Sequence, residues 1–493
     1  MSTENSSPVA RRTFLRGAAS LSAAAIAGRG IYSVLDDFVT PPRAWAATTP
    51  PRQEQWIVDA VTFILDNNTS VFIPPIYNDV FTAKLSPAVT WNKTALVNAQ
   101  NRLEAALDHV QAPYPATGAG LTMVVSWGLP YFRTYVPGPW QAKAPRDLTL
   151  PLVNGQRQLA VLDAIRFPSD PASTVLEDNH VAFKIRSDQQ SIVRSVEEQL
   201  FADPSSPAYV GDLFALTSKR IGFLGRGFGT TSVAKTLALQ AGVPGADQIP
   251  DKTQLMMGFT STQVAALGLD NIVGFETLRG VTDQFPSGYF AHGCAMHLSH
   301  LNLDIQSWYG KSYADRVQRM FSPSTAVPSD SGTVTLPNGP ANVATATQVK
   351  NDALGKHLAG HNAALQMATR LANDTLDNYG RLRKKGSAVP FREDFNTLDN
   401  PFTWYVDGDG TVHQPAPDQP GLHFAVFIPT SGKFHIARSA MDGILPDGTN
   451  LRTAPYDLSD SQIGFNSQMQ ATHRQNYLVP PRAHRSFPLA ELL

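Results

Sequence analysis

Apolar positions in the first half of the chain follow helical spacing in some segments and strand-like runs in others. Residues 98–110 carry leucine and valine on one side of a predicted helix, and residues 191–201 are expected to form a second helix. Residues 121–127 form a continuous apolar run between two glycine-containing turns, which predicts a buried strand. Residues 180–185 and 220–224 are expected to be further strands.

The second half of the chain shows the same mixture of predicted strands and helices. Residues 289–301 alternate in part and residues 422–428 are an apolar run, so both are predicted strands. Residues 305–321 and 434–441 have apolar positions at helical spacing and are predicted helices. Strands mixed with helices, twice over, predict an α+β fold with two related lobes.

This repeat divides the chain into four expected parts. Residues 1–46 form a leader, residues 47–270 an N-terminal half and residues 271–445 a C-terminal half. Residues 446–493 show few strong periodicities and are expected to be a loop-rich C-terminal extension.

Composition narrows the classes of function. Hydrophobic residues make up 42% of the chain and charged residues 16%, which suits a packed core and excludes global disorder. The net charge of −1 gives no sign of a nucleic-acid partner. Cys294 is the single cysteine, which excludes an internal disulfide and a cysteine-rich zinc or iron–sulfur site. A bound metal would therefore need histidine or carboxylate ligands.

The leader has the features of a twin-arginine export signal. Arg11 and Arg12 precede a small-residue apolar stretch, and Ala44-Trp45-Ala46 follows as a signal-peptidase site. The stretch is too short to span a bilayer, so no membrane anchor is expected after cleavage. These features predict export by the twin-arginine machinery to the periplasm or the exterior, a route that accepts folded, cofactor-loaded proteins.

Two motifs point to other cofactors. Gly225–Gly229 follows a predicted strand, but Thr230 stands where a dinucleotide-binding motif needs its third glycine, so an ordinary turn is favoured. His292, Cys294 and His300 share one face of a regular strand, where Met296 would join them. Such soft ligands suit copper, and a copper site is one alternative.

Several segments resemble the dye-decolourising peroxidases, in the family's order. They are residues 120–128, 255–259, 288–308 and 421–427, and from first to last they span most of 121–443. The resemblance implies two fused ferredoxin-like halves of the dimeric α/β barrel type. It also implies haem b as cofactor and hydrogen peroxide as oxidant for an unidentified organic reductant.

The chain departs from that family at its Gly-Phe-x-Asp-Gly signature. Gly258 and Phe259 match, and the resemblance places Phe259 beside the haem. Ser261 stands at the position of the acid and Thr262 at that of the second glycine. A serine hydroxyl can donate, accept or orient water, but it lacks the acidity of a proton relay.

The resemblance also implies an axial histidine ahead of the last core strand. His361, followed by Asn362, matches the family's pattern best and is the expected iron ligand. His357 lies four residues earlier, on the same face of a helix, and is the alternative ligand.

The distal groups are expected after that histidine. Arg392 is the best match to the family's distal arginine and Arg383 the second, and Arg383 could instead meet a haem propionate. A fixed guanidinium stabilises charge on the departing oxygen of peroxide. Asp394, if it points into the pocket, could replace the missing acid as proton relay.

The leading hypothesis is therefore an exported haem b peroxidase of this type. The missing signature acid favours an alternative: a haem-free or catalytically silent relative that serves as a secreted binding protein.

Overall fold

The structure is a computed structural model of the 493-residue chain. It describes residues 53–55, 61–66, 69–225, 232–259, 274–323, 345–361, 369–402, 405–406, 412–413 and 419–493. The leader and Ser261 lie outside these ranges.

The first half is an antiparallel sheet backed by two helices. Its elements are β3 (Tyr77–Leu85), α2 (Lys93–Gln111), β4 (Thr122–Gly128), β6 (Val181–Ser187), α5 (Gln190–Glu197) and β7 (Phe214–Phe223). Helix α2 begins where the Asn92 side chain accepts a hydrogen bond from the Ala95 N–H, and it buries a stripe that includes Leu103 and Leu107. The strand order β7–β3–β6–β4 is that of a ferredoxin-like βαββαβ unit.

The second half repeats this topology. Its elements are β8 (Cys294–Leu303), α7 (Ile305–Tyr309), α8 (Tyr313–Phe321), α9 (Ala346–Lys356), β11 (Phe391–Arg392), β12 (Phe395–Thr397), β15 (Gly421–Ile428), α11 (Ser431–Met441) and β16 (Met469–Val479). Strand β8 lies between β16 and β15, and β15 pairs with β11 and β12, so the order is again ferredoxin-like. The expected α+β fold of two fused ferredoxin-like halves is confirmed. The second half runs to the end of β16, however, beyond the boundary expected at residue 445.

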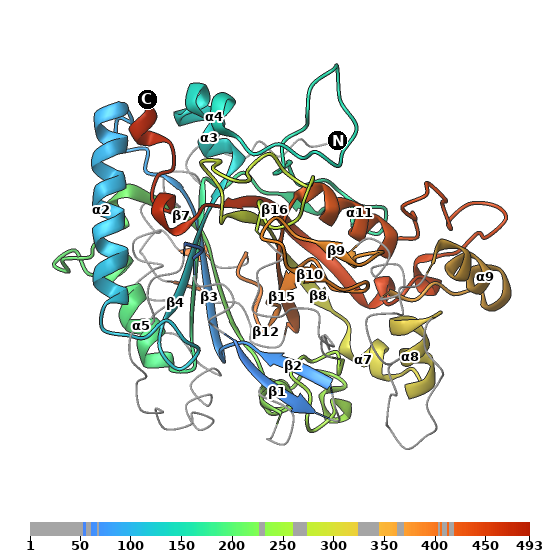
Figure 1. The fold of residues 1–493 in the computed structure, drawn as a ribbon. Coiled ribbons are helices and arrows are strands. Elements are labelled where there is room, and N and C mark those ends of the chain that lie inside the picture. The colour runs from blue at the N-terminus through green and yellow to red at the C-terminus, as the bar shows by residue number, and fades with distance from the viewer. Residues whose placement is uncertain are drawn as a thin grey trace, which may run out of the picture.

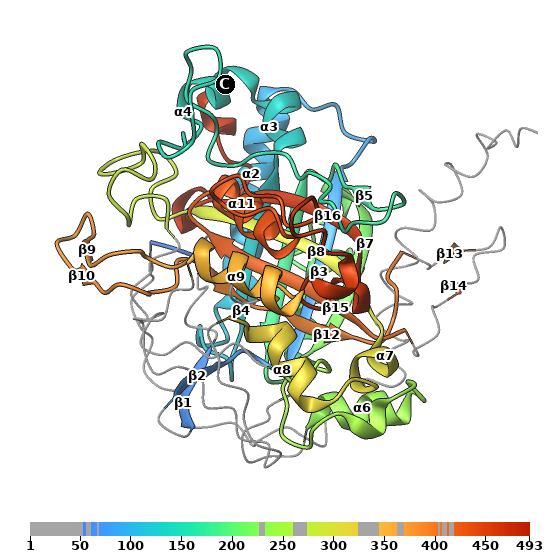
Figure 2. The same cartoon turned by 90° about the vertical axis from the view of Figure 1, so that its right-hand side faces the viewer.

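The two sheets join edge to edge into a closed ring, in the order β15–β8–β16–β4–β6–β3–β7–β12. One seam pairs Tyr477 with Gly128 and Leu478 with Trp127. The other is the single pair of Asn396 with Phe223. Helices α2 and α5 cover the ring on one side, and α7, α8 and α9 lie on the opposite side (Figures 1 and 2). This is the expected α/β barrel, formed within one chain.

The barrel interior is part apolar and part ionic. Val80, Met296 and Phe427 belong to its apolar core. Lys184 and Glu393 are also fully buried there, with Lys184 Nζ 3.6 Å from Glu393 Oε2, and Arg186 forms an ion pair with the same carboxylate. Burial lowers the pKa of Lys184 to about 8 although Glu393 opposes the shift.

Shorter elements surround the barrel. They are β1 (Thr62–Asp66), β2 (Thr69–Ile73), α3 (Leu129–Tyr135), α4 (Pro137–Lys143), β5 (Val175–Leu176), α6 (Val233–Gln240), β9 (Thr375–Leu376), β10 (Leu382–Arg383), β13 (Tyr405–Val406) and β14 (Val412–His413). A π-turn, η2 (Glu198–Ala202), extends α5, and single 3-10 turns are η3 (Gly211–Leu213), η4 (Ala246–Gln248), η5 (Asp460–Gln462), η6 (Asn466–Gln468), η7 (Arg482–His484) and η8 (Ala490–Leu492). Within the described ranges, no helix has the length and apolar character needed to cross a membrane.

Candidate functional site

A cavity lies against the outer face of the second-half sheet, and a cross-strand row of residues forms part of its floor. The register aligns Arg474 on β16 with Ser299 on β8, and Ser299 with Phe424 on β15. Because Arg392 pairs with Val426 and Phe395 with His423, the next position in the row is that of Asp394. All four members of the row line the cavity.

Strand alternation directs the side chains of the sequence Arg392-Glu393-Asp394 to two sides of the sheet. Arg392 and Asp394 are partly exposed and line the cavity. Glu393 is fully buried among the barrel cations. Arg392 and Asp394 therefore line the same cavity, whereas the Glu393 carboxylate lies in the barrel interior.

The remaining lining is mostly apolar and comes from helices and loops. Helix α11 contributes Phe434, Arg438 and Met441, helix α8 contributes Met320 and Phe321, and further lining residues are Leu255, Met257, Phe259, Leu301, Leu303, Leu422, Phe465 and Met469. Phe259 packs edge-on against Phe321, with ring centroids 5.4 Å apart. The empty space among these residues is about 890 Å³, open solvent included.

His361 enters the cavity from outside the sheet. It is 7% exposed, and its ring packs on Phe465 with centroids 4.3 Å apart. Gly464 lies against it with φ +53, and a Cβ there would stand 3.0 Å from the His361 Cβ, so this position requires glycine. Burial, with Arg438 and Arg392 nearby, lowers the pKa of His361 to about 3. The ring is therefore neutral at physiological pH and has a lone pair free for a metal.

The pKa values of Asp394 and Arg392 are both shifted. Burial raises the pKa of Asp394 from 3.8 to about 6, against the opposing charges of Arg392 and Lys184. Burial also lowers the pKa of Arg392, and Asp394 partly offsets that shift. A carboxyl group poised near neutral pH beside a guanidinium can take up and return a proton.

Four polar atoms of the cavity lining are buried without a hydrogen-bond partner among the described residues. They are His361 Nδ1, Ser299 Oγ, Asp394 Oδ1 and Arg474 Nε. Unpaired buried polar atoms are costly, and in native proteins most are satisfied. Their convergence on one cavity indicates that the lining is complementary to a ligand with polar groups.

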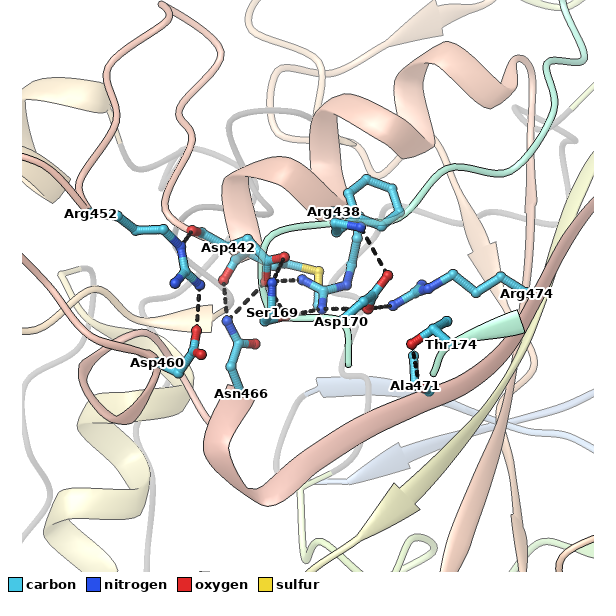
Figure 3. A network of polar contacts seen from close by, with 12 residues as sticks. Ser169, Asp170, Thr174, Arg438, Asp442, Arg452, Asp460, Asn466, Ala471 and Arg474 are labelled. Carbon is cyan, nitrogen blue, oxygen red and sulfur yellow. Dashed lines mark hydrogen bonds and ion pairs between the residues drawn. The ribbon is translucent and has the colours of Figure 1, made fainter. Parts of the chain in front are cut away.

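Arg438 and Arg474 are cavity residues that the sequence did not reveal. Arg438 comes from α11 and Arg474 from β16, and both approach Asp170, a residue of the first half (Figure 3). Arg438 also pairs with Asp442 on its own helix. An arginine in an apolar helix and one in a polar strand carry no local motif, and only the fold brings them together.

Three other expected residues lie elsewhere or remain outside the described ranges. Arg383 lies in β10 and does not line the cavity, because its guanidinium is bound to Asp377 with Nε 3.0 Å from Oδ2. His357 ends helix α9 in an exposed left-handed conformation with φ 50, away from the cavity lining. Ser261 lies outside the described residues.

The copper alternative finds no support in the described part of the chain. His292 precedes β8 in a left-handed conformation, with φ 66, and its Nδ1 lies 3.3 Å from Glu276 Oε1. Cys294 and His300 lie in β8, and both are buried. No three His, Cys, Asp or Glu side chains among the described residues come together as a metal-binding group.

Solved structures with a similar chain course include an encapsulated DyP-type peroxidase from Mycobacterium smegmatis, with 13% identity, 84% of this chain and 95% of that chain covered, and a TM-score of 0.43. DyPB from Rhodococcus jostii has 11% identity, coverage of 84% and 96%, and a TM-score of 0.45. A dye-decolorizing protein from V. cholerae has 14% identity, coverage of 84% and 97%, and a TM-score of 0.41. At these values the likeness carries no statement about chemistry.

No curated protein matches the sequence. One family model matches residues 88–481, which is well over half of the chain. The chain therefore belongs to DUF7405, a family of unknown function.

Proposed function

We propose that this protein binds haem b in the cavity and reduces hydrogen peroxide there, at the expense of an organic substrate. The observation that carries the proposal is the cavity itself. A buried neutral histidine, a guanidinium and a carboxyl of raised pKa line one mostly apolar cavity. The sequence resemblance to dye-decolourising peroxidases supports the same assignment.

The residues present fit a haem. His361 would hold the haem iron, since a neutral imidazole nitrogen is the usual protein ligand of haem iron. Phe259, Phe424 and Phe465 offer flat apolar surface for the macrocycle. Haem, when bound, supplies the redox chemistry that uses peroxide as oxidant.

The chain's own contribution is to orient the peroxide and to move its proton. Arg392 would stabilise the negative charge that grows on the departing oxygen. Asp394 Oδ1, which has no partner among the described residues, would accept a proton from one peroxide oxygen and return it to the other. This role would compensate for the serine at position 261.

The test is a titration of the purified protein with hemin, followed by the Soret band. We expect His361→Ala to lose the spectrum of a histidine-ligated haem, and added imidazole to restore it. The matched control is His357→Asn, four residues away and outside the cavity lining, because asparagine tolerates the left-handed backbone found there. This control should keep the wild-type spectrum.

Two results would contradict the proposal. An unchanged spectrum in His361→Ala would show that another residue ligates the iron. No Soret band in the wild type after hemin is supplied would favour a haem-free binding protein.

We also propose that the protein is exported by the twin-arginine route before it acts. The support is the order of Arg11-Arg12, apolar stretch and cleavage site in the sequence. Insertion of haem before export fits this route, since it carries folded proteins.

A further inference from the structure

One end of the cavity holds two converging arginines. Arg438 and Arg474 are 5% and 1% exposed, and both line the cavity. Their guanidinium carbons lie 5.5 Å and 5.1 Å from the centroid of the same Phe167 ring. Two like charges are therefore buried side by side, an arrangement that needs anionic partners.

The anionic partners that the protein provides lie behind the arginines. Arg474 pairs with Asp170, and Arg438 pairs with Asp442 and lies 3.9 Å from Asp170 (Figure 3). Ser169 Oγ accepts a hydrogen bond of 2.7 Å from Arg438 and donates one of 2.7 Å to Asp442. Neither aspartate is among the residues that line the cavity.

The charged groups that face a ligand at this wall are mostly guanidinium groups, with their aspartate partners behind them. Its charged lining residues are Arg392, Arg438 and Arg474 against the single acid Asp394. Arg474 Nε is a buried donor without an acceptor among the described residues, and Ser299 Oγ, next in the same cross-strand row, is also unpaired. A carboxylate is the group that such donors recognise best, because a guanidinium binds it through paired charge-assisted hydrogen bonds.

The first half of the chain holds this end in place. The segment that carries Ser169 and Asp170 leads into β5, which pairs in parallel with β16 and places Leu176 beside Arg474. Thr174 Oγ1 donates a hydrogen bond of 2.8 Å to the Ala471 carbonyl. The Asp170 carboxylate also accepts a hydrogen bond of 2.9 Å from the Phe167 N–H, which helps to hold it beside Arg474.

We propose that the Arg438–Arg474 end of the cavity binds a carboxylate carried by a ligand with a large apolar body. Two sources share this chemistry: a propionate of a porphyrin, and the carboxylate of an organic acid. The porphyrin case rests on the proposed haem function, whereas the organic-acid case stands without it.

The experiment compares acids with their esters, which keep the apolar body and lose the charge. Hemin and its dimethyl ester, in the same dilute detergent, are titrated by absorbance. Cis-parinaric acid and its methyl ester are titrated by fluorescence. A lost charge-assisted hydrogen bond weakens binding by roughly 10-fold or more, so each acid should bind the wild type at least about 10-fold more tightly than its ester.

Variants assign the effect to the arginines. Arg474→Gln should lose most of the preference for the acid and keep the affinity for the ester. The matched control is Arg452→Gln, because Arg452 bonds to the Asp442 carbonyl in the same network but does not line the cavity. Asp170→Asn should instead increase the affinity for the acid, because it removes a negative charge that competes for Arg474.

The outcomes separate this proposal from the haem function. If hemin and its ester bind equally and parinaric acid binds no better than its ester, the carboxylate site is refuted while haem binding stands. If no porphyrin binds but parinaric acid does, with dependence on Arg474, the haem function fails and the carboxylate site holds. If Arg474→Gln and Asp170→Asn each weaken the binding of the acid and of its ester equally, the network has a purely structural role. That result would overturn the proposal.

Discussion

Replacing Asp394 by asparagine should change how the stability of the haem-free protein depends on pH. The pKa of Asp394 is raised from 3.8 to about 6, chiefly by burial. The folded protein therefore holds this proton more tightly than the unfolded chain does, and stability falls as pH rises from about 4 to above 6. An asparagine side chain has nearly the same shape as that of aspartate and does not titrate, so the variant escapes this loss.

The size of the effect follows from the shift. About 2 pH units at about 1.4 kcal/mol each correspond to about 3 kcal/mol. The Asp394→Asn variant should match the wild type below pH 4 and exceed it by up to about 3 kcal/mol in the free energy of unfolding above pH 7.

Urea unfolding of both proteins at a series of pH values between 4 and 8 measures this difference. Asp251→Asn, which removes an exposed carboxylate, controls for the change in net charge. A variant less stable than the wild type at pH 7.5, or a difference that does not vary with pH, would refute the assignment of Asp394 as a buried acid that holds its proton near neutrality.

Three further changes test other parts of the structure. Arg392→Leu should slow the reaction with peroxide by roughly 100-fold or more while the haem spectrum is kept, and stopped-flow mixing with peroxide checks this. Glu393→Gln removes the carboxylate between Lys184 and Arg186 and should cost about 3–5 kcal/mol in urea unfolding, whereas Asp178→Asn at an exposed pair should cost under about 1 kcal/mol. Changing Arg11 and Arg12 to lysine should leave folded protein in the cytoplasm, as fractionation would show.

Much of the fold could be predicted from the sequence, but several strands, among them β3 and β16, could not. The strands β4 and β15 are apolar runs and were predicted as strands on that ground. Strands β3 and β16 were not, because they bury polar side chains on the barrel or cavity side, such as Asn78 on β3 and Arg474 on β16. A strand that is buried on both faces does not show the usual alternation of apolar and polar residues. When one of those faces packs against charged side chains, the apolar run is lost as well. For this reason residues 446–493 were expected to be a loop-rich extension, although they contain β16, the fourth strand of the second half.

The candidate site divides in the same way. Phe259, His361, Arg392 and Asp394 were found through a family resemblance, and the structure brings them to one cavity. Arg383 was expected there for its position after the histidine, but a nearby carboxylate holds it elsewhere. Arg474 lies beside Ser299 in the cavity because β16 pairs with β8, a pairing between distant segments that no local pattern encodes.

The ionic interior of the barrel has a consequence for how the chain is made. Synthesis proceeds from the N-terminus, so the first half emerges with Lys184 and Arg186 on a sheet face that has no partner yet. An apolar face at that stage would invite aggregation with other nascent chains. A face that carries two cations tolerates water, and it meets its carboxylate only when Glu393 arrives with the second half. The charges that reduce the apolar core of the finished barrel therefore also reduce the apolar surface that the first half exposes before the barrel closes.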